Sequence, residues 1–195
     1  MTHPMHSGLP VNGHREESTR LPVERAPIPT ELIIPLHQHI GTPAAPVVET
    51  GDKVSRGQLI AAAQGFVSAN IHAPIDARVT AIESRPVPHP SGLSGMCIVL
   101  APEAYAEWPT PGPRDMNRES ITECKPMEIK QKIRDAGIVG LGGATFPTSV
   151  KIKSGIDRHI DTLIINGCEC EPYLTADYRL MIEAAASIIS GALLS

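Results

Sequence analysis

The feature that most constrains the fold is a series of short apolar runs over residues 31–100, each ended by a turn signal. The stretch VVETGDKVSRGQLIAAAQGFVSANIHAPIDARVTAI separates its apolar runs with Gly-Asp and Arg-Gly pairs. Short strands at such close spacing are typical of a small antiparallel unit. The sequence therefore predicts an all-β unit over residues 31–100, in which RPVPHPSGLSG is a loop and MCIVLAP is the closing strand.

The composition narrows the class of protein. Hydrophobic residues make up 42% of the 195 residues and aromatic residues only 3%, so the core must be built mainly from Val, Ile, Leu and Ala. A net charge of -4 leaves no basic surplus, which argues against a nucleic-acid partner. There is no apolar stretch near the roughly 18 residues that a membrane-spanning helix requires, and no secretory signal. We expect no transmembrane segment.

Cysteine and histidine patterns give no metal site. The four cysteines, Cys97, Cys124, Cys168 and Cys170, lack paired CxxC spacing and are expected to be free thiols. Two thiols in the CECE stretch without further spaced partners make a poor metal site. His37 and His39 are expected to form a surface pair on one side of a strand. The prediction is that this chain binds no metal.

Residues outside the β unit are expected to form an arm, a linker and the start of a second domain. Residues 1–30 lack periodicity and predict an extended arm that takes its order from another part of the protein. Residues 101–122 are rich in proline and predict a linker. Residues 123–195 predict the start of an α/β domain, with KPMEIKQKIRDAG as an amphipathic helix that ends at Gly137 as a left-handed C-cap.

The rest of this second domain is predicted as one strand and one helix. DTLIING is a compact apolar run typical of a buried strand, and TADYRLMIEAAASIISGALL predicts a helix with Thr175 or Asp177 as its N-cap. The apolar face of this helix includes Leu180, Ala184 and Ile188. One strand is too little sheet to bury that face, since sheets usually have about five strands. We therefore expect the sequence to be the front part of a longer protein.

The β unit resembles the barrel-sandwich domains that carry lipoyl or biotinyl groups. The resemblance rests on GDKVSRGQ before the central hairpin and HAPIDARV after it. A carrier domain presents a lysine at this hairpin, but here Phe66 stands at the corresponding place, and Lys53 belongs to an earlier turn. Because a carrier requires that amine, the sequence favours a structural or docking module.

The loop GIVGLGGATFPTSVK, residues 137–151, is rich in glycine but differs from the common phosphate-binding loops. The Walker pattern is absent, and the GxGxxG fingerprint has Thr145 at its third glycine position. The fingerprint also belongs between a strand and a helix, whereas a predicted helix precedes this loop. A ligand-binding loop and a plain helix-terminating turn both remain open for this stretch.

A second polar cluster follows the predicted strand. INGCECEPYLTAD places Asn166, Glu169 and Glu171 directly after it, where open α/β sheets have their ligand crevices. In an extended segment Glu169 and Glu171 would share one face, and carboxylates there can accept hydrogen bonds from ribose hydroxyls or a flavin ring. Taken alone, the cluster favours a solvated acidic turn over a binding site.

The two clusters occur with other motifs in a specific order. GLGGATFPTSVK precedes LIINGCECEPYLTADYRLM, and both follow IPLHQHIGTPAAPVVETGDKVSRGQ and RPVPHPSG. In this order the sequence resembles the RnfC family of the Rnf electron-transport complex, and through the two clusters it is similar to the flavoprotein subunit of respiratory complex I. The resemblance implies a multidomain α+β protein: a barrel-sandwich domain followed by an incomplete α/β domain that binds FMN and NADH.

The resemblance also implies an activity. Members of the family accept hydride from NADH through FMN and pass electrons to [4Fe-4S] clusters, as part of a membrane-bound ion-translocating oxidoreductase. It implies the other Rnf subunits as partners and a peripheral position on the cytoplasmic side of the bacterial inner membrane. The family's cluster-binding cysteine runs are absent from this sequence, so the chain alone is expected to be inactive. The alternative is a non-catalytic docking module with a vestigial flavin loop.

Within the glycine-rich loop the resemblance implies residues for both cofactors. Gly140, Gly142 and Gly143 would let the backbone approach the flavin closely. Phe146 would offer an aromatic face at the nicotinamide entrance, and Lys151 would neutralise flavin phosphate or polar ring atoms.

Within the acidic segment the resemblance implies three more cofactor contacts. Asn166 and Glu169 would contact FMN, and Glu171 would bind a ribose hydroxyl of NADH. The complex I flavoprotein usually has an arginine where Leu141 stands and an aspartate where Cys168 stands, so the phosphate contacts are expected to differ. No residue of the chain is predicted to be catalytic itself, because the flavin carries the hydride chemistry.

Overall fold

The computed structural model describes residues 12–88, 92–108, 125–141, 145–152 and 162–193. The chain divides into two compact units. The first unit is Ala26–Asp161, and the second unit combines Met1–Arg25 with Thr162–Ser195. The predicted arm, linker and domain boundaries are not tested by this division and stay predictions. Predicted features that fall on the other residues, including most of the linker, lie outside the described part of the chain.

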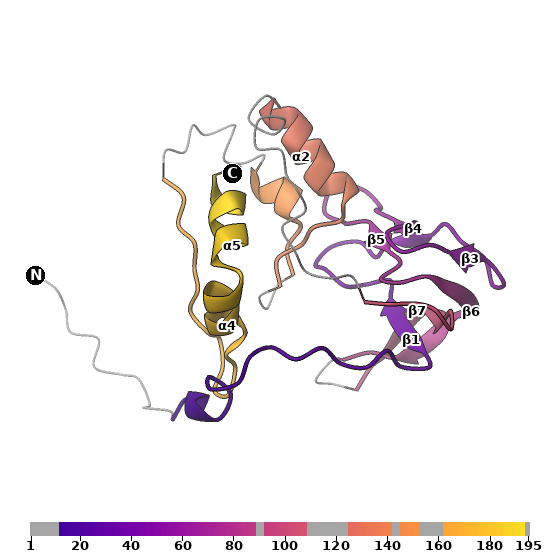
Figure 1. Ribbon diagram of the computed structural model, residues 1–195. Coiled ribbons are helices and arrows are strands. Elements are labelled where there is room, and N and C mark those ends of the chain that lie inside the picture. Colours follow the sequence, from indigo (N-terminus) through magenta and orange to yellow (C-terminus); the bar gives the residue numbers. More distant parts are fainter. Residues whose placement is uncertain (1–11, 89–91, 109–124, 142–144, 153–161, 194–195) are drawn as a thin grey trace, which may run out of the picture. The chain divides into compact units, whose positions relative to one another are not determined.

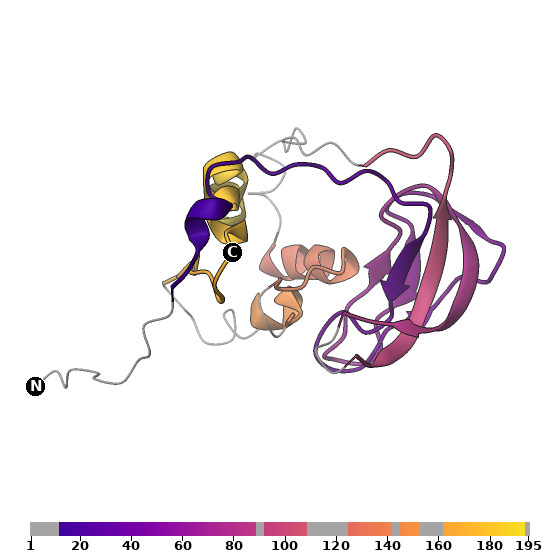
Figure 2. The same cartoon turned by 90° about the horizontal axis from the view of Figure 1, so that it is seen from below.

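The first unit is built on two antiparallel sheets that curl around a shared core (Figures 1 and 2). One sheet has four strands in the order β1-β7-β6-β3, and the other has three in the order β2-β4-β5. The strands are β1 Leu32–Pro35, β2 Ala45–Pro46, β3 Lys53–Val54, β4 Leu59–Ala62, β5 Ile71–His72, β6 Ala77–Pro86 and β7 Ser94–Pro102. This is the all-β unit that the turn spacing predicts, with the barrel-sandwich architecture that the resemblance implies.

The core of the first unit is aliphatic. Ile60, Val79, Ile98 and Leu100 are completely buried and belong to one hydrophobic cluster. The long β6–β7 ladder supplies Val79, Ile98 and Leu100, and β-branched residues such as Val79 and Ile98 suit its pleated, half-buried surface. The predicted closing strand is confirmed as β7, with Cys97 buried inside it.

The hairpin between β4 and β5 carries the residue that replaces a carrier lysine. Phe66 lies in the loop that joins the two strands, and 56% of its surface is exposed. The buried side chain of Ser68 stabilises the loop with two hydrogen bonds: its hydroxyl accepts one from the Gln64 N–H and donates one to the Thr42 carbonyl. The hairpin therefore presents an aromatic ring where an attached cofactor would require an amine.

Helix α2, Pro126–Asp135, confirms the predicted amphipathic helix and ends as expected at Gly137. Gly137 has a φ of 66°, its N–H bonds to the Arg134 carbonyl, and the Ile138 N–H bonds to the Ile133 carbonyl. These two bonds form the Schellman motif that satisfies carbonyl groups at a helix C-terminus.

The C-terminus of α2 is fixed to the β4–β5 hairpin loop. The Asn70 side chain donates to the Asp135 carbonyl over 3.1 Å, and Arg134 donates to the Gly65 carbonyl over 2.9 Å. A Cβ atom at Gly137 would collide with the backbone carbonyl of Asn70. The helix end and the hairpin loop thus touch backbone to backbone, which places the start of the glycine-rich loop beside the β unit.

The second unit contains two short helices in place of the single predicted one. These are α4, Ala176–Glu183, and α5, Ala185–Ala192, with a break at Ala184, whose φ and ψ are -130° and 29°. Thr175 stands at the predicted N-cap position of α4 but makes no side-chain cap bond. Its hydroxyl instead donates to Ser18. Leu180 remains exposed, consistent with a face that lacks a sheet to cover it.

The N-terminal arm lies along residues 173–183, which include α4 (Figure 1). It includes the 3-10 helix η1, Arg15–Glu17. The Tyr173 N–H donates to the Gly13 carbonyl over 2.7 Å, Arg179 donates to the Thr19 carbonyl, and the Val23 N–H donates to the Glu183 carboxylate over 3.0 Å. The arm takes its order from residues 173–183.

The predicted strand DTLIING is not a strand in the structure. Residues 162–167 are irregular, and Leu163, Ile164 and Ile165 are 57%, 83% and 56% exposed. An extended segment is assigned to a sheet only when a neighbouring strand pairs with it. No such neighbour is present among the described residues, so an apolar run typical of a buried strand stands in solvent.

Substitution of Gly137 tests the backbone contact at the end of α2. We expect Gly137→Ala to lower the free energy of unfolding by about 3 kcal/mol or more, because it adds a clash with Asn70 to the strain of a positive φ. Gly51→Ala is the matched control, since Gly51 also has a positive φ but has open space around it, and it should cost about 1 to 2 kcal/mol. Urea unfolding measures both, and equal losses would contradict the contact.

Candidate functional site

The glycine-rich loop folds back on itself in the first unit. Val139 and Pro147 form an antiparallel bridge, and the Gly140 N–H donates to the Phe146 carbonyl over 2.9 Å. Thr145 completes the return with a φ of 43°. The Gly140 N–H therefore closes the loop and is not directed at a ligand. Gly142 and Gly143 lie outside the described residues, and their role stays a prediction.

Phe146 and Lys151 are brought together beside Gly140. The Lys151 ammonium lies 5.9 Å from the centroid of the Phe146 ring, a distance typical of a cation–π contact. A Cβ atom added at Gly140 would lie 3.5 Å from Lys151 Nζ. The cation and the aromatic ring predicted to meet the cofactors thus share one face of the loop. Leu141, at the position of the complex I arginine, is 93% exposed.

The acidic segment is turned rather than extended, and it belongs to the second unit. The Asn166 side-chain oxygen accepts the Cys168 N–H over 2.9 Å, and residues 170–173 bend and turn. Glu169 is half-buried and accepts the Tyr178 N–H at the start of α4, whereas Glu171 is exposed. The expectation that Glu169 and Glu171 share one face of an extended segment is therefore wrong.

A cavity of about 560 Å³ lies on the acidic segment, entirely within the second unit. Its lining combines polar side chains, a thiol, an aromatic ring and one arginine: Arg15, Thr19, Gly167, Cys168, Glu169, Thr175, Tyr178 and Met181. Of the predicted residues in this segment, Glu169 lines the cavity, while Asn166 and Glu171 are not among its lining residues. We call this space the arm cavity, because Arg15 and Thr19 come from the N-terminal arm.

Arg15 and Thr19 are not identifiable from the sequence. They are more than 140 positions away from the acidic segment along the chain, and the arm has no periodic pattern. The contact depends on hydrogen bonds between backbone groups of the arm and residues 173–183. Every residue type except proline has both a backbone N–H and a backbone carbonyl group. A contact made through these groups therefore cannot be predicted from a sequence motif.

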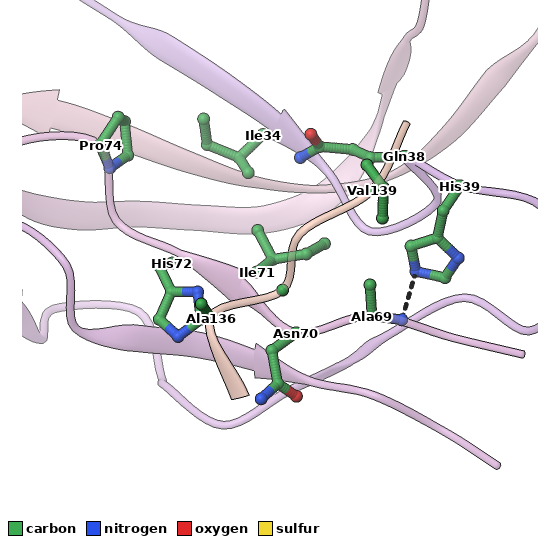
Figure 3. A pocket seen from close by; sticks show the side chains of 11 residues that line it. Ile34, Gln38, His39, Ala69, Asn70, Ile71, His72, Pro74, Ala136 and Val139 are labelled. Atoms are coloured by element: carbon green, nitrogen blue, oxygen red, sulfur yellow. Dashed lines mark hydrogen bonds between the residues drawn. The ribbon is translucent and has the colours of Figure 1, made fainter. Parts of the chain in front are cut away.

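A second cavity, of about 310 Å³, lies in the first unit where the end of α2 meets the β4–β5 hairpin (Figure 3). His39 lines it and is buried, with Nδ1 3.1 Å from the Ile40 carbonyl and Nε2 accepting the Ala69 N–H over 3.1 Å. Both ring nitrogens are thus occupied by the backbone. The expected surface pair is wrong, because His37 is exposed, His39 is a buried structural residue, and both follow the end of β1.

The arm cavity fits the flavin that the resemblance implies. Ligand pockets for small molecules usually span about 300 to 1,000 Å³, and the volume of the arm cavity falls in this range. A flavin mononucleotide presents a phosphate, a chain of hydroxyls and a ring with both donors and acceptors. The cavity offers a guanidinium, hydroxyls and a carboxylate to match them.

Comparison with known families assigns both parts of the chain. Residues 3–104, just over half of the chain, match the family described as the RnfC barrel sandwich hybrid domain. The chain belongs to the RnfC family. Residues 133–195 match the Nuo51 FMN-binding domain, a region that includes the glycine-rich loop and the acidic segment. The resemblance read from the motifs is confirmed.

Curated relatives agree with this family. A subunit of the ion-translocating oxidoreductase complex of Pseudomonas aeruginosa is 44% identical over 190 residues, which are 97% of this chain and 24% of that protein. A subunit of the proton-translocating ferredoxin:NAD(+) oxidoreductase complex of Clostridium ljungdahlii is 42% identical over 94% of this chain and 39% of its own length. For the Rhodobacter capsulatus relative, again from an ion-translocating oxidoreductase complex, the identity is 43%, over 97% of this chain and 37% of that protein. The chain thus spans about a quarter to two fifths of the length of these relatives.

Among the described residues, no helix is long and apolar enough to cross a membrane.

The cysteines of the described residues differ sharply in environment. Burial raises the pKa of the Cys97 thiol, which donates to the Gly95 carbonyl. Cys168 and Cys170 are exposed free thiols. Within the described ranges no group of three or more His, Cys, Asp or Glu side chains could hold a metal ion.

Alkylation should separate these thiols. Because the thiolate is the reactive form, we expect iodoacetamide at neutral pH to label Cys168 and Cys170 more than about tenfold faster than Cys97 in the folded protein. Peptide mapping by mass spectrometry measures each rate. In denaturant all three should react alike, and equal rates in the native protein would mean that the β6–β7 core opens.

The attachment of the arm to α4 should depend on pH. The hydrogen bond from the Val23 N–H, followed by those from Arg179, lowers the pKa of Glu183 below its ordinary value. A carboxyl whose pKa is lower in the folded state stabilises it above the unfolded pKa and loses this effect as the pH falls through the folded value. The Val23 amide should therefore shift in NMR spectra with a midpoint below about 4.3, the pKa of a free glutamate.

Glu183→Gln is the control for this titration, because it removes the ionisable group and should leave the Val23 amide insensitive to pH in the same range. A midpoint at or above the value of a free glutamate would contradict the hydrogen bond from Val23 as its cause.

Proposed function

We propose that this chain is part of an electron-transport subunit that accepts hydride from NADH through FMN. Electrons then pass to iron-sulfur clusters of an Rnf-type ion-translocating oxidoreductase. The observation that carries the proposal is the match of residues 133–195 to the Nuo51 FMN-binding domain, in a chain whose residues 3–104 match the RnfC barrel-sandwich domain. The names of the relatives support it, since they are subunits of ion-translocating oxidoreductase complexes.

Residues of the glycine-rich loop would bind and orient the nicotinamide. Phe146 would lie against it, and Lys151, which already stands over the Phe146 ring, would supply a positive charge close to the cofactors. Gly140 lies beside this pair, since a Cβ atom there would be in ordinary contact with Lys151 Nζ at 3.5 Å. Gly142 and Gly143 would let the backbone approach the flavin.

Residues of the acidic segment would bind hydroxyl and ring donors. Glu169 lines the arm cavity and has one carboxylate oxygen committed to the Tyr178 N–H, which fixes the orientation of the other. Asn166 would contact FMN, and the exposed Glu171 would accept a ribose hydroxyl of NADH. When bound, FMN supplies the conversion of a two-electron hydride transfer into single-electron steps.

The proposal extends to parts of the protein beyond this sequence. The [4Fe-4S] clusters would be bound by cysteine runs of the kind found in the family. The other Rnf subunits would be its partners, and the protein would lie peripherally on the cytoplasmic side of a bacterial inner membrane. The relative whose name pairs ferredoxin with NAD(+) supports a nicotinamide nucleotide as the redox substrate.

The alternative function is a docking module with a vestigial flavin loop. The exposed Phe66 at the hairpin favours it, because an aromatic side chain on an exposed loop is a common anchor for a protein partner. The two functions differ in whether the full-length protein binds FMN at all.

Kinetics of the full-length protein test the proposal. With an artificial electron acceptor, we expect it to oxidise NADH, and Phe146→Ala and Glu171→Gln should each raise the apparent KM for NADH by about tenfold. FMN content should remain unchanged in both variants, because the affected contacts are to the nicotinamide nucleotide.

Phe66→Ala is the matched control, since it removes the other phenylalanine of the chain and should leave KM unchanged. A full-length protein that neither changes flavin fluorescence nor oxidises NADH would overturn the proposal and favour the docking module.

A further inference from the structure

We propose that the N-terminal arm is part of the nucleotide site, with Arg15 in the arm cavity binding the phosphate ester of the nucleotide. This inference rests on the proposed function, because it requires that the acidic segment binds a flavin or nicotinamide nucleotide. It adds a residue outside the matched Nuo51 FMN-binding region, which begins at residue 133.

The arm is anchored on both sides of Arg15. On one side the Gly13 carbonyl accepts the Tyr173 N–H over 2.7 Å, and the ring of His14 stacks on Tyr173 with centroids 4.8 Å apart and planes at 4°. On the other side the Val23 N–H donates to Glu183 over 3.0 Å. Because both anchors lie in residues 173–183, Arg15 has a defined position beside the acidic segment.

The guanidinium of Arg15 has no competing partner among the residues that the structure describes. It makes no ion pair or side-chain hydrogen bond with any of them, although it lines the same cavity as Glu169. Arg179, by contrast, is committed to Glu183 and to the Thr19 carbonyl. An arginine with free donors that borders a cavity is suited to bidentate recognition of a phosphate.

The remaining lining residues match what is attached to such a phosphate. Thr19 and Thr175 bring hydroxyls, and Glu169 brings a carboxylate, so that together they can exchange hydrogen bonds with a chain of hydroxyl groups. Because Gly167 has no side chain, the backbone on this side of the cavity can lie close to Met181 of α4; a Cβ atom at Gly167 would be 2.8 Å from the Met181 sulfur. A cation beside hydroxyls and one carboxylate is the complement of a phosphorylated polyol.

FMN and the dinucleotide NADH both contain this chemistry, and binding measurements distinguish them. Titration of the full-length protein with FMN and with riboflavin, followed by flavin fluorescence, separates recognition of the phosphate from recognition of the ring. Displacement by ADP-ribose, which contains the phosphates of the dinucleotide without its nicotinamide, probes the second source.

For a flavin phosphate at Arg15, we expect Arg15→Gln to weaken FMN binding by about tenfold and to leave riboflavin binding unchanged. For a dinucleotide phosphate, the same variant should weaken ADP-ribose binding by a similar factor while FMN binding is kept. Arg20→Gln is the matched control, because it removes an equal charge from the same arm at a residue that does not line the cavity. Either result supports the proposal if the control shows no comparable loss.

Unchanged affinity of Arg15→Gln for both FMN and ADP-ribose would overturn the proposal while leaving the proposed function intact. Equal losses for Arg15→Gln and Arg20→Gln would also overturn it, since they would reflect the general charge of the arm. A wild-type protein that binds neither FMN nor ADP-ribose would overturn the proposed function and this inference together. Amide NMR signals of Val23 and Tyr173 report whether the arm remains attached in each variant.

Discussion

The contact between Gly137 and the Asn70 backbone is the constraint on which the first unit depends. A helix can approach another backbone this closely only where a side chain is missing, and Gly137 also provides the left-handed conformation that ends α2. The Asn70 side chain reinforces the junction through its bond to the Asp135 carbonyl. The glycine-rich loop that contains Phe146 and Lys151 therefore starts at a residue that is fixed to the β sandwich.

The second unit depends on a different kind of interaction. Its helices are short and expose much of their apolar surface, so hydrophobic burial contributes little to holding them. The N-terminal arm is joined to them chiefly by hydrogen bonds, several of which use backbone groups. The first unit is therefore stabilised by a packed aliphatic core. The second unit instead depends on hydrogen bonds between segments from opposite ends of the sequence.

Local features are predictable from the sequence, and long-range ones are not. The strands of the sandwich, the helix before the glycine-rich loop and its cap at Gly137 follow from turn residues, periodicity and one glycine, all of which act over a few positions. Residues 162–167 have the composition of a buried strand but no pairing strand among the described residues. Composition does not reveal whether such a neighbouring strand exists. The burial of His39 and the participation of Arg15 in a cavity depend on partners far along the chain.

The exposed run of Leu163, Ile164 and Ile165 has a consequence for handling the protein. A short apolar segment rich in β-branched residues, irregular and accessible to solvent, is a template for pairing with the same segment of another molecule. Such self-association grows with concentration and with conditions that suppress charge repulsion. This stretch, which lies outside both cavities, is therefore expected to lower the solubility of the chain unless a partner covers it.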